Sequence, residues 1–320
     1  MSDQRNINTL TILRIGLLLL GVAACVYLVN TNLPALKTLL QEGTLTVWPH
    51  LFVALAMFIL HVVLVFYAWH FSLGLVGIDV SLRSSALIFL VSLVTRYIPG
   101  GVWHLGSRLL AMSRLGKNPY LVSVTLFLEQ MAALAVCMLL AMLFVSVSTV
   151  LFPDLGSVTL NTFGTKEWFF VLAGIGLLVI LYPPVFKGLL TRAFGFLKGQ
   201  KLSAPLATSG LFQLYGIHVL SLLVFAVGYE QVLTTVAGDV LPPTAIVVAV
   251  VLVATLLGFL APFIPGGIGV RESLIVVLLA PFTSAAEATA MAIASRILII
   301  VVEFFMLFLM IFMHGRMSDD

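Results

Sequence analysis

Residues 95–104 read TRYIPGGVWH and residues 261–272 read APFIPGGIGVRE, so both stretches carry the core Ile-Pro-Gly-Gly inside a strongly apolar run. Proline removes a backbone donor and clashes with the preceding helical turn, and paired glycines adopt dihedrals that other residues resist. Each stretch therefore predicts a helix that breaks and restarts. Broken backbone at membrane depth is tolerated only where it is buried in protein or lines a polar cavity. Two such breaks in corresponding parts of the two halves point to a transporter's binding site.

The composition is that of an integral membrane protein. Of the 320 residues, 61% are hydrophobic and 9% are charged, and the mean hydropathy is +1.19, whereas soluble domains average about 25% charged residues. No polar stretch is long enough for a soluble domain, so we expect a single integral membrane domain over residues 1–320. The net charge of +3 does not favour nucleic acid as a partner. Cys25 and Cys137 lie in apolar runs and offer neither a disulfide framework nor a metal site.

About 20 apolar residues are needed to cross the hydrocarbon core. By this measure we predict an all-α polytopic membrane protein with about six full transmembrane helices, at residues 10–29, 48–75, 120–146, 168–182, 211–233 and 288–313. The first is expected to be an uncleaved helix rather than a signal peptide. The arms around the two Pro-Gly-Gly stretches, 85–98 with 102–111 and 245–264 with 268–281, are interpreted as re-entrant hairpins. Arms of different depth would give eight apparent spans, and complete crossings would give ten.

The positive charges predict the orientation, because Lys and Arg near segment ends favour the cytoplasm. With a cytoplasmic N-terminus and each hairpin returning to its own side, the outer segments hold only Lys37 and Lys166. The cytoplasmic segments then hold Arg5, Arg83, Arg114, Lys117, Lys187, Arg192, Lys198, Lys201 and Arg316. We therefore expect both termini in the cytoplasm.

This topology predicts an inverted repeat. Three full helices lie between the two hairpins, so the first hairpin enters from the cytoplasm and the second from outside. The halves cover roughly residues 48–150 and 208–313 and are joined by the fourth full helix and a basic cytoplasmic connection. Halves related in this way can rock about a shared midplane site, which is the geometry of alternating access.

Ionisable side chains inside a membrane are costly, so each is a functional candidate. A restarted helix also presents unpaired N–H groups that suit a phosphate, and arginine offers a planar fork matched to its oxygens. We expect Arg96, Arg108 and Arg271 to surround a lipid phosphate, with Glu272 and Glu129 neutralising them when the site is empty. The full set of predicted substrate-binding residues is Arg96, Pro99, Gly100, Gly101, His104, Arg108, Glu129, Pro265, Gly266, Gly267, Gly269, Arg271, Glu272, Arg296 and Glu303.

The spacing of the charges also predicts partners. Glu129 and Arg296 follow the prolines of their own halves at nearly the same distance, so we expect them to meet, directly or through water, near the pseudo-symmetry axis. Glu303 lies on the same helix face as Arg296 and is predicted to be its partner. A purely structural reading stays open, in which arginine–glutamate pairs only hold helices together and the Pro-Gly-Gly stretches are only kinks.

Residues 264–272, together with residues 96–101 and Glu129, resemble the flippase-like transmembrane region of lysylphosphatidylglycerol synthases. The resemblance covers about residues 10–313 and implies lipid translocation, with a bacterial inner (plasma) membrane as the expected location. Some members of that family carry a C-terminal soluble aminoacyltransferase domain, and others stand alone and are associated with phospholipids or polyprenyl-phosphate-linked glycans. Few residues follow Phe312, so we expect a stand-alone member. The chain departs from the family at Gln130, where arginine is frequent, and at residues 102–104, which lack the glycine of the second copy.

Three classes of function compete. The first is a flippase or scramblase for an anionic phospholipid or a polyprenyl-phosphate-linked lipid, without ATP as direct energy source because no phosphate-binding Gly-x-x-x-x-Gly-Lys motif is present. The second is an intramembrane lipid-modifying enzyme, which we do not expect because no catalytic motif is recognisable. The third is an accessory partner of a membrane glycosyltransferase. We expect no cofactor and no metal, and a homo-oligomer remains an open alternative.

Overall fold

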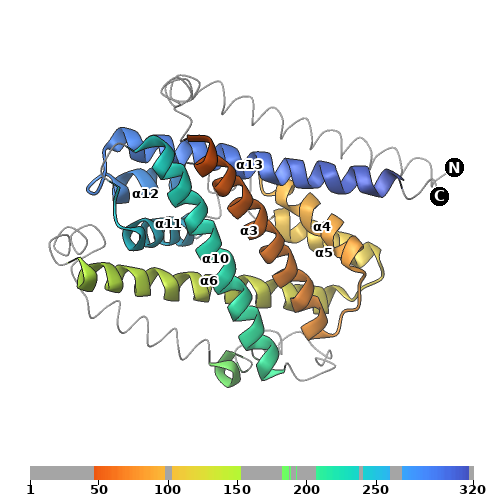
Figure 1. Ribbon diagram of the computed structural model, residues 1–320. Helices are drawn as coiled ribbons and strands as arrows, with labels where there is room; N and C mark the ends of the chain where they lie inside the picture. The colour runs from red at the N-terminus through yellow and green to blue at the C-terminus, as the bar shows by residue number, and fades with distance from the viewer. Residues whose placement is uncertain are drawn as a thin grey trace.

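A computed structural model describes residues 47–97, 103–152, 182–186, 188, 192, 207–237, 241–259 and 269–316, with side chains up to residue 312 (Figure 1). Every named element among these residues is an α-helix and none is a strand, as the sequence predicts. The helices are α3 (Val47–Val76), α4 (Leu82–Thr95), α5 (Trp103–Arg114), α6 (Pro119–Leu151), α10 (Thr208–Val236), α11 (Thr244–Phe259), α12 (Val270–Leu279) and α13 (Ala285–Arg316).

Four of these helices, α3, α6, α10 and α13, are long and apolar enough to cross a membrane. They coincide with four of the six predicted full spans. The other two predicted spans, 10–29 and all but the last residue of 168–182, lie outside the described residues, as do both Pro-Gly-Gly cores. The helices next to the cores are short, with 14 and 12 residues in α4 and α5 and 16 and 10 in α11 and α12. The re-entrant path and the exact number of spans stay predictions.

Local sequence explains where the first helices end and begin. Gly77 ends α3 with a φ of +84°, a left-handed conformation that glycine adopts without a steric penalty. Ser81 caps α4 by accepting a hydrogen bond from the Ser84 amide at 3.2 Å. Asn118 caps α6 by accepting from the Tyr120 amide at 2.9 Å, and a proline follows at the first helical position.

The eight helices form two sets that correspond in order and length. The first set is α3, α4, α5 and α6, and the second is α10, α11, α12 and α13. Each extensive contact within the first set has its counterpart in the second: α3 with α6 matches α10 with α13, and α4 with α5 matches α11 with α12. The contacts between the sets correspond in the same way: α4 of the first set packs on α13 of the second, and α11 of the second set packs on α6 of the first. This is the contact pattern that a pseudo-two-fold axis produces.

The contact between α3 and α10 is the most extensive in the described part of the chain. The two helices are antiparallel, because residue numbers rise along one as they fall along the other (Figure 1). The contacts that show this are His50 with Gln231, His61 with Ser221, and Leu75 with Gly210. Close approach requires small residues on α10: a Cβ at Gly228 would lie 2.6 Å from the ring of Phe58. The antiparallel packing of α3 and α10 is what a two-fold axis perpendicular to both helices would produce.

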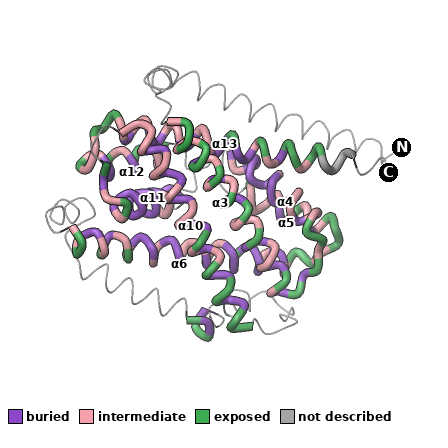
Figure 2. Tube along the Cα trace, viewed as in Figure 1, coloured by how far each residue is buried: buried purple, intermediate pink, exposed green. Residues whose placement is uncertain are grey.

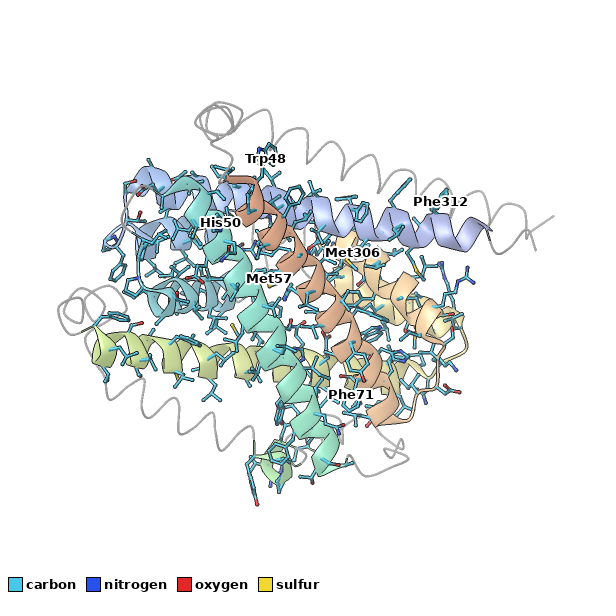
Figure 3. All side chains as sticks on the ribbon, in the orientation of Figure 1. Trp48, His50, Met57, Phe71, Met306 and Phe312 are labelled. Atoms are coloured by element: carbon cyan, nitrogen blue, oxygen red, sulfur yellow. The ribbon has the colours of Figure 1, made fainter. Side chains whose placement is uncertain are left out.

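The buried core lies between the two sets, and exposed residues lie on the outside (Figure 2). Helix α11 is the most enclosed, with residues 246–252 all buried, because it packs against α6, α10 and α12. Helix α13 has two different faces. Met306 packs toward the interior, while Phe312 points outward and is half exposed (Figure 3). Trp48 and Phe71 mark the two ends of α3 in the same view.

Candidate functional site

The charged side chains that the structure places in ion pairs with one another, among the described residues, form two groups. The first group, here called the α5–α6 pair, consists of Arg108 and Glu129. The second, here called the central cluster, contains Arg96, Tyr97, Arg271, Glu272, Arg296 and Glu303, which come from α12, α13 and the end of α4. The first group lies within one set of helices, and the second joins both sets.

The Arg108 guanidinium in the α5–α6 pair is held by two hydrogen bonds and two aromatic rings. Its Nε donates to Ser92 Oγ at 2.8 Å, and its Nη1 donates to Glu129 Oε2 at 3.2 Å. The guanidinium carbon also lies over the rings of Trp69 and Phe89, at 5.0 and 4.6 Å from the centroids. Arg108 and Glu129 are each about 4% exposed. A charge pair so enclosed has donors directed at protein partners, which is the arrangement of a structural contact between helices.

The end of α4 meets α13 in the first part of the central cluster. Arg96 forms an ion pair with Glu303, and the Tyr97 hydroxyl donates to the other oxygen of Glu303 at 2.9 Å. The Tyr97 ring also contacts two guanidinium groups, those of Arg96 and Arg296, each 5.5 Å from its centroid. Glu303 is 1% exposed, so its charge depends on these two partners.

Glu272 occupies the position between Arg271 and Arg296 in the second part of the cluster. Its Oε1 lies 3.8 Å from Arg271 Nη2 and 3.6 Å from Arg296 Nη1, both beyond ordinary hydrogen-bond length. Its Oε2 accepts from the Gly269 amide at 2.7 Å and so caps the first turn of α12. The carboxylate therefore occupies the place where the sequence predicts an anion: beside arginine, at the start of a restarted helix.

Arg271 has hydrogen-bond donors that no described residue accepts from. Its guanidinium lies 5.7 Å from the ring centroids of both Phe225 and Tyr229 on α10. Its Nε and Nη2 are buried and have no hydrogen-bond partner among the described residues, and neither has the Tyr229 hydroxyl. Buried donors without acceptors are costly and call for an acceptor that binds there. The described part of the chain thus presents a guanidinium held on aromatic faces with donors free for an anion.

The charges of the central cluster do not cancel. Three arginines face two glutamates, which leaves one positive charge among the described residues of this site. Arg271 and Arg296 both approach Glu272 Oε1, and Arg96 and Arg296 both lie 5.5 Å from the Tyr97 ring centroid, so the like charges lie close together. A group of arginines in a low-dielectric environment attracts an anion, and planar guanidinium groups suit the oxygens of phosphate. Among the described residues no cluster of three or more His, Cys, Asp or Glu side chains could hold a metal ion.

Neither a family model nor a curated protein matches this chain. The similarity to lysylphosphatidylglycerol synthases stays a prediction from the sequence.

Two predicted partners are wrong in the described structure. Glu129 was expected to meet Arg296, but Glu129 pairs with Arg108 on α5, and Arg296 lies beside Glu272 on α12. Glu303 was expected to pair with Arg296, but it pairs with Arg96. Equivalent positions in two halves need not face each other, because α6 and α13 are on opposite sides of the α3–α10 contact, as Figure 1 shows.

The remaining predicted site residues are placed as follows. Arg96, Arg271, Glu272, Arg296 and Glu303 come together in the central cluster, and Gly269 begins α12 with a φ of +88°. His104 lies in the first turn of α5, where its carbonyl accepts from Ser107 Oγ at 3.0 Å. The prolines and paired glycines of both cores lie outside the described residues, namely Pro99, Gly100, Gly101, Pro265, Gly266 and Gly267.

Three aromatic residues of the site were not predicted. Tyr97 directly precedes the first Ile-Pro-Gly-Gly core, and its position beside Arg96 is a signal that the sequence offers. Phe225 and Tyr229 lie one helical turn apart on α10, a spacing that is also typical of ordinary packing. Their contact with Arg271 depends on how α10 and α12 meet.

Packing behind Arg271 leads to a prediction about Gly258 on α11. A Cβ at this position would lie 3.2 Å from the Arg271 Cβ and 3.7 Å from its Cα. We expect Gly258→Val to push the Arg271 backbone off Phe225 and Tyr229 and to weaken the binding of an anion at least severalfold, while helix content stays unchanged. Titration of the purified protein with inorganic phosphate measures the binding, and circular dichroism of the same sample measures the helix content. Gly106→Val is the matched control, because a Cβ at Gly106 meets no atom within 4 Å. Equal binding by both variants would contradict the packing argument.

Proposed function

We propose that this protein translocates a lipid with an anionic phosphate-containing head group across a bacterial inner membrane. The observation that carries the proposal is the central cluster, where Arg271 holds buried donors that find no acceptor among the described residues, beside a further pair of arginines. An arginine-lined site inside apolar helices suits a head group that must leave water while its hydrocarbon chains remain in lipid.

The correspondence between the two sets of helices supports a transport mechanism. We infer that they form an inverted repeat. The helix contacts of one set match those of the corresponding helices in the other set, and α3 and α10 are antiparallel. Repeats inverted in the membrane place their shared site near the midplane and expose it alternately by rocking. The central cluster fits this position, since α4 belongs to one half and α12 and α13 to the other.

The proposal assigns the chain no covalent step. The head group binds the arginines, Glu272 is displaced from between them, and the head group leaves toward the other leaflet. Energy would come from a gradient, from consumption of the translocated lipid or from the membrane potential. For an anion the potential supplies about 2.3 kcal/mol per charge per 100 mV, in the outward direction.

Glu272 gives a prediction that separates binding from release. Because its carboxylate competes with the substrate for Arg271 and Arg296, we expect Glu272→Gln to bind anionic lipid about three- to tenfold more tightly, corresponding to roughly 1 kcal/mol of relieved competition. Release then becomes slower, so the maximal transport rate falls. Titration of the purified protein with a short-chain anionic phospholipid, followed by tryptophan fluorescence, measures the affinity. Glu287→Gln, outside the cluster, controls for the loss of a carboxylate. Weaker binding by Glu272→Gln than by wild type would contradict the competition.

The direct test is a reconstitution experiment. Purified protein is placed in vesicles that carry a labelled phosphatidylglycerol, a labelled phosphatidylcholine or a labelled polyprenyl phosphate in one leaflet, and the appearance of the label in the other leaflet is timed. We expect at least one anionic lipid to cross faster than in protein-free vesicles. If none does, the proposal is wrong. Mass spectrometry of the recovered lipids distinguishes an enzyme, which would leave an altered product. Transport by the purified protein alone would exclude a role that needs a glycosyltransferase partner.

A further inference from the structure

Tyr97 is the last described residue before the first Ile-Pro-Gly-Gly core, and it is 8% exposed. It directly follows Arg96, the C-cap of α4. Its ring and its hydroxyl serve different partners, because the ring contacts guanidinium groups and the hydroxyl donates to a carboxylate.

Both distant partners of Tyr97 lie on α13, in the other half of the chain. The hydroxyl donates to Glu303 at 2.9 Å, and the ring lies 5.5 Å from the guanidinium of Arg296. These two residues are two helical turns apart and so lie on one face of α13. Tyr97 therefore spans that face from an attachment point on α4. Arg96 strengthens the same attachment through its ion pair with Glu303. We call Arg96, Tyr97 and Glu303 the clasp.

The corresponding contact in the other half is chemically different. Where α4 meets α13, the partners are charged, whereas α11 contains no ionisable residue in its described span Thr244–Phe259. Helix α11 meets α6 through buried apolar side chains, and Cys137 Sγ donates to the Leu252 carbonyl at 3.5 Å. Of two contacts related by the pseudo-two-fold axis, one is apolar and one is held by a buried carboxylate with two donors. An ion pair and hydrogen bonds depend on the alignment of donor and acceptor. The contact between the end of α4 and α13 therefore separates as a unit once Glu303 loses its alignment with its two donors.

We propose that Tyr97 is a positioning residue. It fixes Glu303 through its hydroxyl and contacts Arg296 through its ring, and so it joins α4 to α13. Arginines from both halves then meet at the central cluster. The site is then complete only while the clasp is closed. Opening the clasp separates Arg96 from Arg271 and Arg296 and weakens the hold on a bound anion. This inference rests on the proposed function for the identity of the anion, but the closing of the clasp can be measured without transport.

The experiment measures a distance and an affinity in the full chain. Cys25 and Cys137 are replaced by alanine, and spin labels are attached to cysteines introduced as Leu82→Cys on α4 and Phe308→Cys on α13, since both positions are exposed. Pulsed electron paramagnetic resonance in lipid nanodiscs then reports the separation of the two helices. The variants are Tyr97→Phe, which keeps the ring and removes the hydroxyl, Tyr97→Leu, which removes both, and Glu303→Gln. Tyr67→Phe is the matched control, since Tyr67 is an exposed residue of α3.

We expect one dominant distance in the wild type and in Tyr67→Phe, and a second, longer distance in Tyr97→Phe that grows in Tyr97→Leu. The half-saturating concentration of short-chain phosphatidylglycerol should rise about tenfold in Tyr97→Phe, the loss expected for a hydrogen bond to a charged group, with less change in the maximal rate. In a Glu303→Gln background the further effect of Tyr97→Phe should be much smaller, because the hydroxyl has already lost its charged acceptor.

Unchanged distance and unchanged half-saturation in Tyr97→Phe would overturn the clasp, even if the wild type transports lipid. A second distance in Tyr97→Phe supports the clasp, even if the wild type moves no lipid and the proposed function fails. Additive effects of Tyr97→Phe and Glu303→Gln would also overturn it, since they would place the two residues in separate interactions. Should Tyr97→Leu not fold, Tyr97→Phe carries the test alone, because it removes a single oxygen atom.

Discussion

Arg271→Ala is expected to lower lipid translocation by about ten- to a hundredfold, because it removes the guanidinium whose Nε and Nη2 have no acceptor in the described residues. Hydrogen bonds to a charged group contribute about 1.5–3 kcal/mol, which corresponds to this range of rates. The loss should be largest for lipids with a net negative head group and smaller for zwitterionic ones. Rates of label transfer in reconstituted vesicles, compared across lipids, measure both expectations.

Two further variants make this result specific. Arg271→Lys keeps the charge but not the planar fork, so transport should recover only in part. Arg114→Ala removes an exposed arginine from the last turn of α5 and should leave the rate within about twofold of wild type. If Arg271→Ala transports as fast as Arg114→Ala, Arg271 does not contact the head group.

The second large effect concerns the stability of the α5–α6 pair. Glu129→Leu leaves the Arg108 charge buried without its carboxylate, and breaking a buried pair costs about 3–5 kcal/mol. We expect a clear fall in the temperature at which the purified protein unfolds in detergent, followed by intrinsic fluorescence. Replacement of both partners, Arg108→Met with Glu129→Leu, removes the charges together and should restore most of the lost stability.

The double variant also tests what the pair does. If Arg108 and Glu129 are structural, the restored double variant should translocate lipid at nearly the wild-type rate. Full stability with lost transport would instead assign the pair a direct part in translocation. Asp79→Asn is the control, because Asp79 is exposed and lies in the turn before α4, where loss of one charge should leave stability almost unchanged.

Much of the helical framework could be predicted because its signals are local. The predicted spans 48–75, 120–146, 211–233 and 288–313 coincide with α3, α6, α10 and α13 within a few residues. Apolar runs of bilayer length, a glycine at the end of α3 and polar caps at Ser81 and Asn118 act within one or two helical turns. Such signals do not depend on which helix is a neighbour.

The sequence singled out the charged residues of the central cluster as candidates, but neither its aromatic residues nor its pairings. The free-energy cost of a charge inside a membrane is enough to select Arg96, Arg271, Glu272 and Arg296 as candidates, because each such charge needs a partner. The partner itself depends on how helices from different halves dock. Glu303 shares a helix with Arg296, yet it is the end of α4 that reaches it. Periodicity along one helix shows which residues share a face, but it does not show which other helix packs against that face.

The sequence by itself determined that this chain is helical and apolar, where its long helices run, and which few charges must find partners. Those properties follow from hydrogen bonding and hydration of the backbone within a segment, which neighbours change little. Only the tertiary structure decided that Arg108 is enclosed by Ser92, Glu129 and two rings, while Arg271 retains donors for which the described part of the chain offers no acceptor. The reason is physical: an arginine side chain is long and satisfies its donors wherever the packed helices bring an acceptor within about 3 Å.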